Sequence, residues 1–209
     1  MRPNAKSLAP ATRDPDRTRR RILAAALVEF SAKGFAGARV DAIARRAKGN
    51  KRMLYHYFGN KEALFSAVLL HKMTERRAWG ASLPNDPSER LSFWFTSACS
   101  DADWVRLLEW EALQVGTGKV IDEAKRRTDS VEWLQRLRQR QKLGQLTAAF
   151  DVSYLALAMQ SLTLFPTAFP QLVRLVTGKS VQDPKFQNEY RKFLKEFAVA
   201  FKPRKPAGK

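Results

Sequence analysis

Apolar residues recur with the period of an α-helix along nearly the whole chain. Near the N-terminus their spacing is i, i+1, i+4, i+5 and i+8, and near the C-terminus it is i, i+3, i+4, i+7 and i+11. The first set is Ile22, Leu23, Ala26, Leu27 and Phe30, and the second is Tyr190, Phe193, Leu194, Phe197 and Phe201. Such spacing places apolar side chains on one helix face. No stretch alternates convincingly at period two, so the sequence predicts an all-α fold without a sheet.

Short local signals predict where these helices begin and end. Aspartate followed by proline occurs at residues 14–15, 86–87 and 183–184, and this pair is typical of an N-cap followed by the first helical residue. Gly34, Gly59 and Gly144 favour helix ends, because glycine readily adopts positive φ. Together the signals predict about nine helices, at residues 14–33, 40–47, 50–58, 60–73, 87–98, 103–115, 120–143, 151–174 and 183–201.

Positive charge is concentrated in the N-terminal third of the chain. The 209 residues have a formal net charge of +18. Residues 1–61 hold fifteen Lys or Arg against four Asp or Glu, a net +11, whereas residues 62–201 carry only +3. A strongly basic region attracts polyanions, nucleic acid first and an anionic membrane second. We therefore expect a basic arm at 1–13, a DNA-binding domain at 14–60, a larger helical domain at 61–201 and a basic tail at 202–209.

The cysteine content and the hydropathy of the chain indicate its cellular location and whether it enters a membrane. Cys99 is the only cysteine, so the chain forms no internal disulfide or cysteine-based zinc site, and a cytoplasmic location fits. The N-terminus lacks the apolar segment of a secretory signal. Residues 152–173 are uncharged and about as long as a membrane-spanning helix. Because they include Pro166, Pro170 and two glutamines, we expect a helix buried in a protein core or interface, and no membrane partner.

Residues 48–65, KGNKRMLYHYFGNKEALF, place cations beside aromatic rings on one short predicted helix. Two short helices joined by a three- or four-residue turn with glycine are typical of a helix-turn-helix motif. Its second helix lies in the DNA major groove, where arginine binds guanine edges and lysine or tyrosine binds phosphates. The residues that would face DNA are Lys51, Arg52, Tyr55, His56 and Tyr57. Leu54 and Phe58 would pack inward. The alternative is an ordinary solvated basic face.

The stretch VDAIARRAKGNKRMLYHYFGNKEALF, residues 40–65, resembles the TetR family of bacterial transcriptional regulators. The family pattern is roughly a hydrophobe, then I-A, three residues to A-G, a small capping residue, L-Y-x-Y-F and K-E-x-L. The matching positions are Val40, Ile43, Ala44, Ala47, Leu54, Tyr55, Tyr57, Phe58, Lys61, Glu62 and Leu64. The match extends over residues 17–70. Elsewhere it is limited to the number of helices and the uncharged eighth helix.

The resemblance implies a three-helix DNA-binding domain and assigns contacts by motif position. Contacts to bases or to the groove are implied for Lys51, Arg52, Met53 and His56. Contacts to phosphates are implied for Tyr55, Tyr57, Lys61, Arg39 and Val40. Asn50 stands where it can cap the second short helix.

Two departures from the family pattern affect this motif. The usual A-G-V-S reads Ala47-Lys48-Gly49-Asn50, so glycine comes one residue late in the turn, where we expect it to adopt positive φ. A hydroxyl residue is common just before the first short helix, but here Ala38-Arg39 leaves that helix without a side-chain N-cap. We expect Arg39 to gain a phosphate contact in exchange.

For the larger domain, the resemblance implies a small-molecule effector and a homodimer. The candidate pocket residues, for an apolar or aromatic effector, are Trp94, Phe95, Trp104, Trp110, Met159 and Phe165. Glu109 and Glu111 flank Trp110, which suggests a cationic aromatic effector. The candidate dimer-interface residues are Leu155, Met159, Leu162, Phe193, Leu194, Phe197 and Phe201. The alternatives are that the rings are ordinary core and that the last two helices cover each other within a monomer.

These features predict a TetR-like repressor that binds a near-palindromic DNA operator as a dimer and is released by an effector. A non-specific or architectural DNA-binding protein is the alternative, because the net charge suits that role too. No cofactor or metal is expected, since the two histidines, His56 and His71, are fifteen residues apart without a cysteine near them. The chain contains no P-loop, nucleophile elbow or paired-carboxylate motif, so we do not expect an enzyme.

Overall fold

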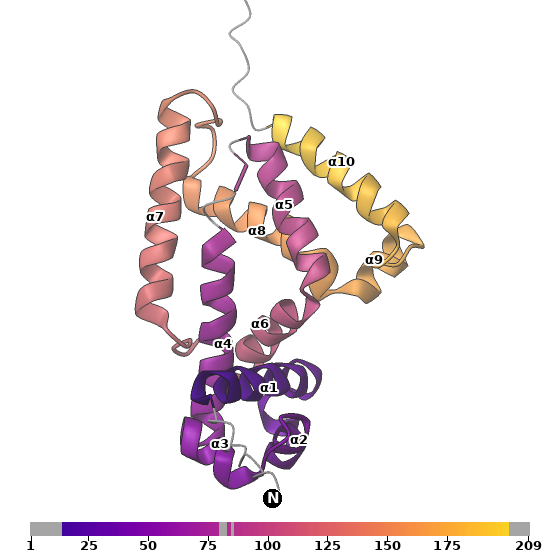
Figure 1. The fold of residues 1–209 in the computed structure, drawn as a ribbon. Coiled ribbons are helices and arrows are strands. Elements are labelled where there is room, and N and C mark those ends of the chain that lie inside the picture. Colours follow the sequence, from indigo (N-terminus) through magenta and orange to yellow (C-terminus); the bar gives the residue numbers. More distant parts are fainter. Residues whose placement is uncertain (1–13, 80–82, 85, 201–209) are drawn as a thin grey trace, which may run out of the picture.

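The computed structural model describes residues 14–79, 83–84 and 86–200, and this part of the chain forms ten α-helices and no β-strand (Figure 1). The helices are α1 (Pro15–Gly37), α2 (Val40–Arg46), α3 (Lys51–Phe58), α4 (Lys61–Ala78), α5 (Pro87–Ser100), α6 (Ala102–Val115), α7 (Glu123–Lys142), α8 (Val152–Ala168), α9 (Pro170–Thr177) and α10 (Pro184–Ala200). The all-α prediction is confirmed. The predictions for residues 1–13, Phe201 and residues 202–209 lie outside the described residues.

Helices α1, α2 and α3 form a small domain at one end of the molecule, and α5 to α10 form a larger one (Figure 1). Helix α4 begins in the small domain and extends into the larger one, while α1 packs against α6 where the two meet. A core of buried residues joins α1, α2, α3 and α4 with α6, including Ile22, Phe30, Ile43, Leu54 and Leu107. A second core joins α5, α9 and α10, and a third joins α7 and α8. The predicted helix-turn-helix, formed by α2 and α3, therefore shares one core with the junction between the small and the larger domain.

The predicted Asp-Pro helix starts are confirmed. Asp14 Oδ1 accepts hydrogen bonds from the backbone N–H groups of Asp16 and Arg17 at 3.0 and 3.1 Å. Asp86 caps α5 in the same way, and Asp183 accepts from the N–H of Lys185 at 2.8 Å at the start of α10. These side chains satisfy N–H groups that have no partner within the helix.

The uncharged segment forms two helices where one was expected, which raises the number from nine to ten. Helix α8 ends at Ala168, Phe169 adopts φ −124° and ψ 61°, and α9 starts at Pro170. Proline lacks an N–H and disfavours helical backbone in the residue before it, so the chain turns at Phe169. The two helices are bent by 88°. Among the described residues no single helix is long and apolar enough to cross a membrane, and only this bent pair passes that test together.

Candidate nucleic-acid interface

In the turn between α2 and α3, the residue with the left-handed conformation is not the one that the sequence predicts. Positive φ falls on Lys48, at 51°, and not on Gly49. A Cβ on Gly49 would meet Cε and Sδ of Met53, at the end of a flexible side chain that can move aside. The Gly49 N–H donates to Ala44 O at 2.9 Å. Lys48 thus takes the left-handed position that glycine normally occupies.

The ends of the two helices are stabilised from different sources. Asn50 Oδ1 accepts from the N–H of Met53 at 2.9 Å, which confirms the predicted cap of α3. Helix α2 has no side-chain cap from Arg39, as predicted. Instead, the buried carboxylate of Glu29 on α1 accepts from the N–H of Arg39 at 3.2 Å and from Lys33 Nζ at 2.7 Å. The hydrogen bond from Lys33, with that from Arg39, lowers the pKa of Glu29 despite its burial.

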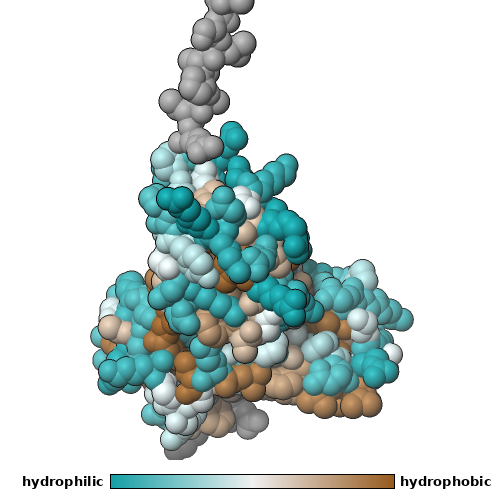
Figure 2. Space-filling model, turned by 90° about the horizontal axis from the view of Figure 1, so that it is seen from below, coloured by the Kyte–Doolittle hydropathy of each residue, from teal (hydrophilic) through white to brown (hydrophobic). Residues whose placement is uncertain are grey.

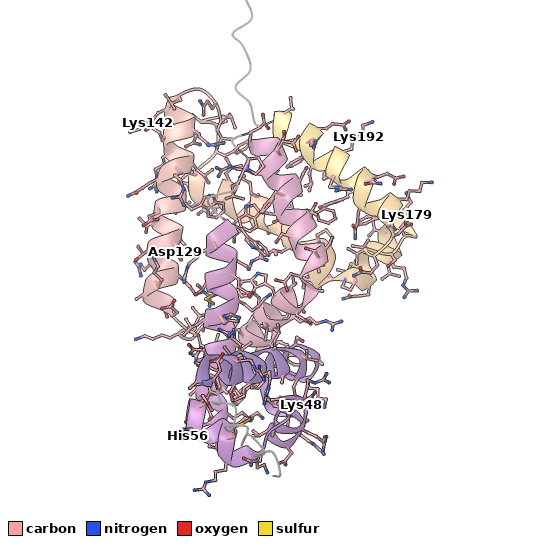
Figure 3. All side chains as sticks on the ribbon, viewed as in Figure 1. Lys48, His56, Asp129, Lys142, Lys179 and Lys192 are labelled. Carbon is pink, nitrogen blue, oxygen red and sulfur yellow. The ribbon has the colours of Figure 1, made fainter. Side chains whose placement is uncertain are left out.

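The outer face of α3 carries most of the predicted DNA-contacting residues. Lys51, Arg52 and His56 are exposed, and Tyr55 is 44% exposed, while Leu54 is buried beneath them. Figure 3 places His56 and Lys48 in the small domain, at the end of the molecule far from α10. Seen from this end, the surface is mostly hydrophilic (Figure 2). The structure therefore brings cations and polar rings together on one accessible surface.

Three of the predicted contact residues are partly engaged within the protein. Lys51 Nζ lies 2.9 Å from Asp41 Oδ2 on α2, and this hydrogen bond raises the pKa of Lys51. Lys61 Nζ donates to Ala36 O at 3.4 Å and lies 4.8 Å from the centroid of the Phe35 ring. Met53 is half-buried over Gly49. The remaining members of the predicted set are Arg39, which is exposed, and Val40 and Tyr57, which are half-buried.

The predicted pocket residues do not gather around one cavity. A cavity of about 600 Å³, widely open to solvent, lies between α1 and α6, and of the six candidates only Trp110 lines it. Its wall consists of Ser31, Ala32, Arg106, Glu109, Trp110, Ala112, Leu113 and Phe169. Phe95 is fully buried in the second core, and Met159 and Phe165 belong to α8 outside the wall. A shared effector pocket for the six residues therefore stays a prediction.

The two glutamates beside Trp110 have different surroundings. Glu109 lines the cavity, and burial raises its pKa. Glu111 is buried and paired with Arg126 Nη1 at 2.8 Å, and it also accepts from the N–H of Ile121 at 3.2 Å. Of the two glutamates, only Glu109 lines the cavity.

A cluster around Arg76 was not foreseen from the sequence. The Arg76 Cζ lies 5.1, 5.3 and 5.2 Å from the ring centroids of Trp79, Trp94 and Trp104, which belong to the end of α4, to α5 and to α6. Burial lowers the pKa of Arg76. Its Nη1 donates to Ser97 Oγ at 3.1 Å. Two predicted pocket residues, Trp94 and Trp104, thus pack against the guanidinium of Arg76. These contacts connect α4 to the larger domain.

The predicted dimer-interface residues divide between core and surface. Leu155 and Leu194 are 3% and 0% exposed, so their side chains lie in the chain's own core. Phe193 is exposed, and Met159, Leu162 and Phe197 are half-buried. Other large apolar side chains of α8, α9 and α10 are exposed: Tyr154, Leu157, Phe165, Leu172, Leu175, Val176 and Val199. An uncharged helix does not reveal from its sequence which face is inward.

This arrangement defines a helix-turn-helix protein whose recognition helix is connected through α4 to a separate helical domain. Residues 22–68 match the family model described as "Bacterial regulatory proteins, tetR family", and residues 92–199 match "Tetracyclin repressor-like, C-terminal domain". The chain belongs to the TetR family of bacterial transcriptional regulators.

Individual relatives agree with this assignment. The HTH-type transcriptional repressor SCO4008 of Streptomyces coelicolor is 34% identical over 172 residues, or 80% of this chain and 88% of that protein. The HTH-type transcriptional repressor NicS of Pseudomonas putida is 55% identical over 56 residues, or 27% of this chain and 26% of that protein. The crystal structure of SCO4942 of Streptomyces coelicolor, described as a transcriptional regulator, has a TM-score of 0.72 at 27% identity and covers 90% of this chain and 99% of its own.

Proposed function

We propose that the protein is a transcriptional repressor that binds a near-palindromic operator as a homodimer and is released by a small molecule. The relative SCO4008, which aligns with most of this chain, is named a repressor. Two recognition helices, one from each subunit, would enter successive major grooves about 34–36 Å apart. Binding of the effector would favour a dimer whose helix spacing no longer fits that operator.

The exposed face of α3 is the observation that carries the DNA-binding part of this proposal. Arg52 and His56 are exposed beside Tyr55, and none of the hydrogen bonds or ion pairs within the described residues occupies the Arg52 guanidinium. An arginine fork matches the O6 and N7 acceptors of guanine in the major groove. Lys61, Arg39 and the tyrosine hydroxyls would bind phosphates and supply a salt-dependent share of the affinity.

The exposed apolar residues of α8, α9 and α10 support the homodimer. Leu157 is 60% exposed, and Leu175 and Val176 are 72% and 84% exposed. Large exposed apolar side chains are unfavourable in water when they gather in a patch, and such a patch is typical of a protein interface. These residues come from the helices that the family resemblance assigns to the dimer. We therefore place the subunit contact on this face.

The cavity between α1 and α6 is our candidate for the effector site. Its volume of about 600 Å³ lies within the range of small-molecule pockets, and most of its wall is apolar. Glu109 is the acidic group in the wall. A ligand here would touch both domains, since Ser31 and Ala32 belong to α1.

Selection of genomic fragments by the purified protein at near-physiological salt tests the proposal, with Arg52→Ala as the comparison. Enrichment of a short inverted repeat that the variant fails to enrich would support a specific dimeric repressor. A non-specific DNA-binding protein is the second candidate, favoured by the net charge of +18. It would recover fragments that share no motif, and that result would refute the specific repressor.

A further inference from the structure

Arg21 on α1 contacts the turn of the helix-turn-helix from outside the motif. Its Nε donates to Ala47 O at 3.0 Å, and its Nη2 donates to Lys48 O at 3.3 Å. Ala47 is the C-cap of α2, and Lys48 is the next residue along the turn. The guanidinium fork therefore holds two successive carbonyl groups at the point where α2 ends.

The turn that Arg21 contacts includes an unfavourable backbone conformation. Lys48 has φ 51°, in the left-handed region that is costly for residues with a Cβ. The glycine that could adopt it freely is one residue later, under the side chain of Met53. Such a conformation persists only where surrounding contacts enforce it. The contacts to Ala47 O and Lys48 O are of this kind.

The chemistry of the contact favours arginine. Carbonyl groups at the end of a helix lack partners within the helix and carry partial negative charge, so a cation is stabilising there. Arginine presents its donors in a rigid planar fork that can satisfy two acceptors at once. Lysine has the same charge but no fork, so it would not hold both carbonyls in the same geometry.

We propose that Arg21 is a positioning residue for the recognition helix. By holding Ala47 O and Lys48 O, it keeps Lys48 in the left-handed conformation and so sets the angle between α2 and α3. Arg21 acts on DNA binding through the turn and not by contact with DNA. The effect on DNA rests on the DNA-binding function proposed above, whereas the effect on the turn does not.

Amide hydrogen exchange in the free full-length protein tests the effect on the turn. The N–H groups of Lys48 and Gly49 donate to Arg45 O and Ala44 O at 3.1 and 2.9 Å, so their exchange reports opening of the turn. Arg21→Lys should speed exchange of these two amides on the order of tenfold. Adding Lys48→Gly should restore slow exchange, because glycine adopts positive φ without strain. Exchange that Arg21→Lys leaves unchanged would overturn the proposal.

DNA affinity tests the consequence, with the duplex enriched in the fragment selection as the probe. Arg21→Lys keeps the charge, so a phosphate contact would survive it largely intact, whereas the fork would be lost. We expect the dissociation constant to rise on the order of tenfold, with an unchanged salt slope. Because Lys48→Gly also removes a charge, the double variant is compared with Lys48→Gly alone, and the two should bind equally. Affinity of Arg21→Lys equal to wild type, or a tenfold loss caused by Arg21→Lys in the Lys48→Gly background as well, would overturn the proposal.

Arg20→Lys is the matched control. Arg20 is exposed on the same helix, and its only described ion pair is with Asp14 at 4.0 Å. This variant should leave both exchange and affinity as in wild type. If the selection yields no preferred duplex, the proposed repressor function fails while the exchange experiment still decides the role of Arg21 in the turn.

Discussion

The indole ring of Trp110 on α6 packs directly on Gly34, the residue at which α1 breaks. A Cβ on Gly34 would lie 2.6 Å from two carbon atoms of the ring, Cδ2 and Cε3. The indole N–H donates to Ser31 O at 3.2 Å. Because α1 belongs to the DNA-binding domain and α6 to the larger domain, this contact joins the two.

Gly34→Ala should destabilise the protein. Gly34 has φ 68° and ψ −179°, a backbone region almost restricted to glycine that costs other residues about 1–3 kcal/mol, and the added methyl group also overlaps the Trp110 ring. We expect the melting temperature to fall on the order of 5 °C for a chain of this length. Gly37→Ala is the control, because its Cβ would meet only Lys33 Cβ, at 3.4 Å. Equal melting temperatures for Gly34→Ala and wild type would contradict the packing described.

Arg52→Ala should weaken binding to the preferred duplex by about 1–3 kcal/mol and reduce the preference over a scrambled duplex. Lys61→Ala should weaken both duplexes alike, since phosphate contacts carry no sequence information. Fluorescence anisotropy with the two duplexes measures both effects. Lys192→Ala, which removes a charge from α10, is the control. An Arg52→Ala protein that loses affinity equally for both duplexes would show that Arg52 does not read bases.

Asp41→Asn should strengthen DNA binding. The carboxylate of Asp41 pairs with Lys51 at 2.9 Å and places a negative charge beside the surface that would face phosphates. We expect a gain of a few-fold at low salt that shrinks as salt rises, because exposed charges are screened. Titrations at two salt concentrations measure it. Glu132→Gln on α7, an exposed residue paired with Arg136 at 3.8 Å, should have no effect. Weaker binding by Asp41→Asn would mean that the ion pair orients Lys51 productively.

Leu157→Asp should convert the dimer to monomers. Leu157 is exposed on α8 and belongs to the face we assign to the subunit contact, and a buried unpaired carboxylate is strongly unfavourable. Light scattering should then give about half the wild-type mass, while the far-UV circular dichroism spectrum stays the same. Val131→Asp on α7 changes a comparably exposed apolar residue away from that face. A Leu157→Asp protein that remains dimeric would exclude this face of α8.

Glu29 should make stability depend on pH below the ordinary glutamate range. Its pKa is lowered from 4.5 chiefly by the hydrogen bond from Lys33. Glu29 therefore takes up a proton more readily in the unfolded chain than in the folded protein. The stabilisation that its ionised carboxylate gives to the fold is complete above about pH 4.5. It is lost as pH falls through the lowered pKa of Glu29 in the folded protein. Glu29→Gln should flatten this part of the curve of melting temperature against pH. Glu132→Gln serves as the exposed control, and a curve for Glu29→Gln that matches wild type would refute the assignment.

Part of the interface could be predicted from sequence because its signals are local. Asn50 caps α3, and Leu54 anchors it inward, as their positions in the motif indicated. The position of positive φ could not be predicted in the same way. Glycine preference pointed to Gly49, but the structure has positive φ on Lys48, whose carbonyl accepts a hydrogen bond from Arg21.

The dimer face and the pocket were harder to predict for a different reason. Periodicity identifies a face only where polar residues occupy the other side. Helix α8 is apolar on all sides, so Leu155 and Leu157 could not be distinguished, although the first is buried and the second is exposed. Aromatic side chains occur in buried cores, around cations and in cavity walls. The sequence therefore could not distinguish Trp104, which packs on Arg76, from Trp110, which lines the cavity.

The sequence by itself determined most of the helices and their caps, the helix-turn-helix and the basic character of its surface, because these depend on residues within a few positions of one another. Only the tertiary structure decided how the motif is supported. Glu29 replaces a missing cap ten residues away, Arg21 holds a turn 26 residues away, and Trp110 reaches Ser31 across 79 residues. Such contacts depend on how helices pack against each other, and no local propensity encodes them.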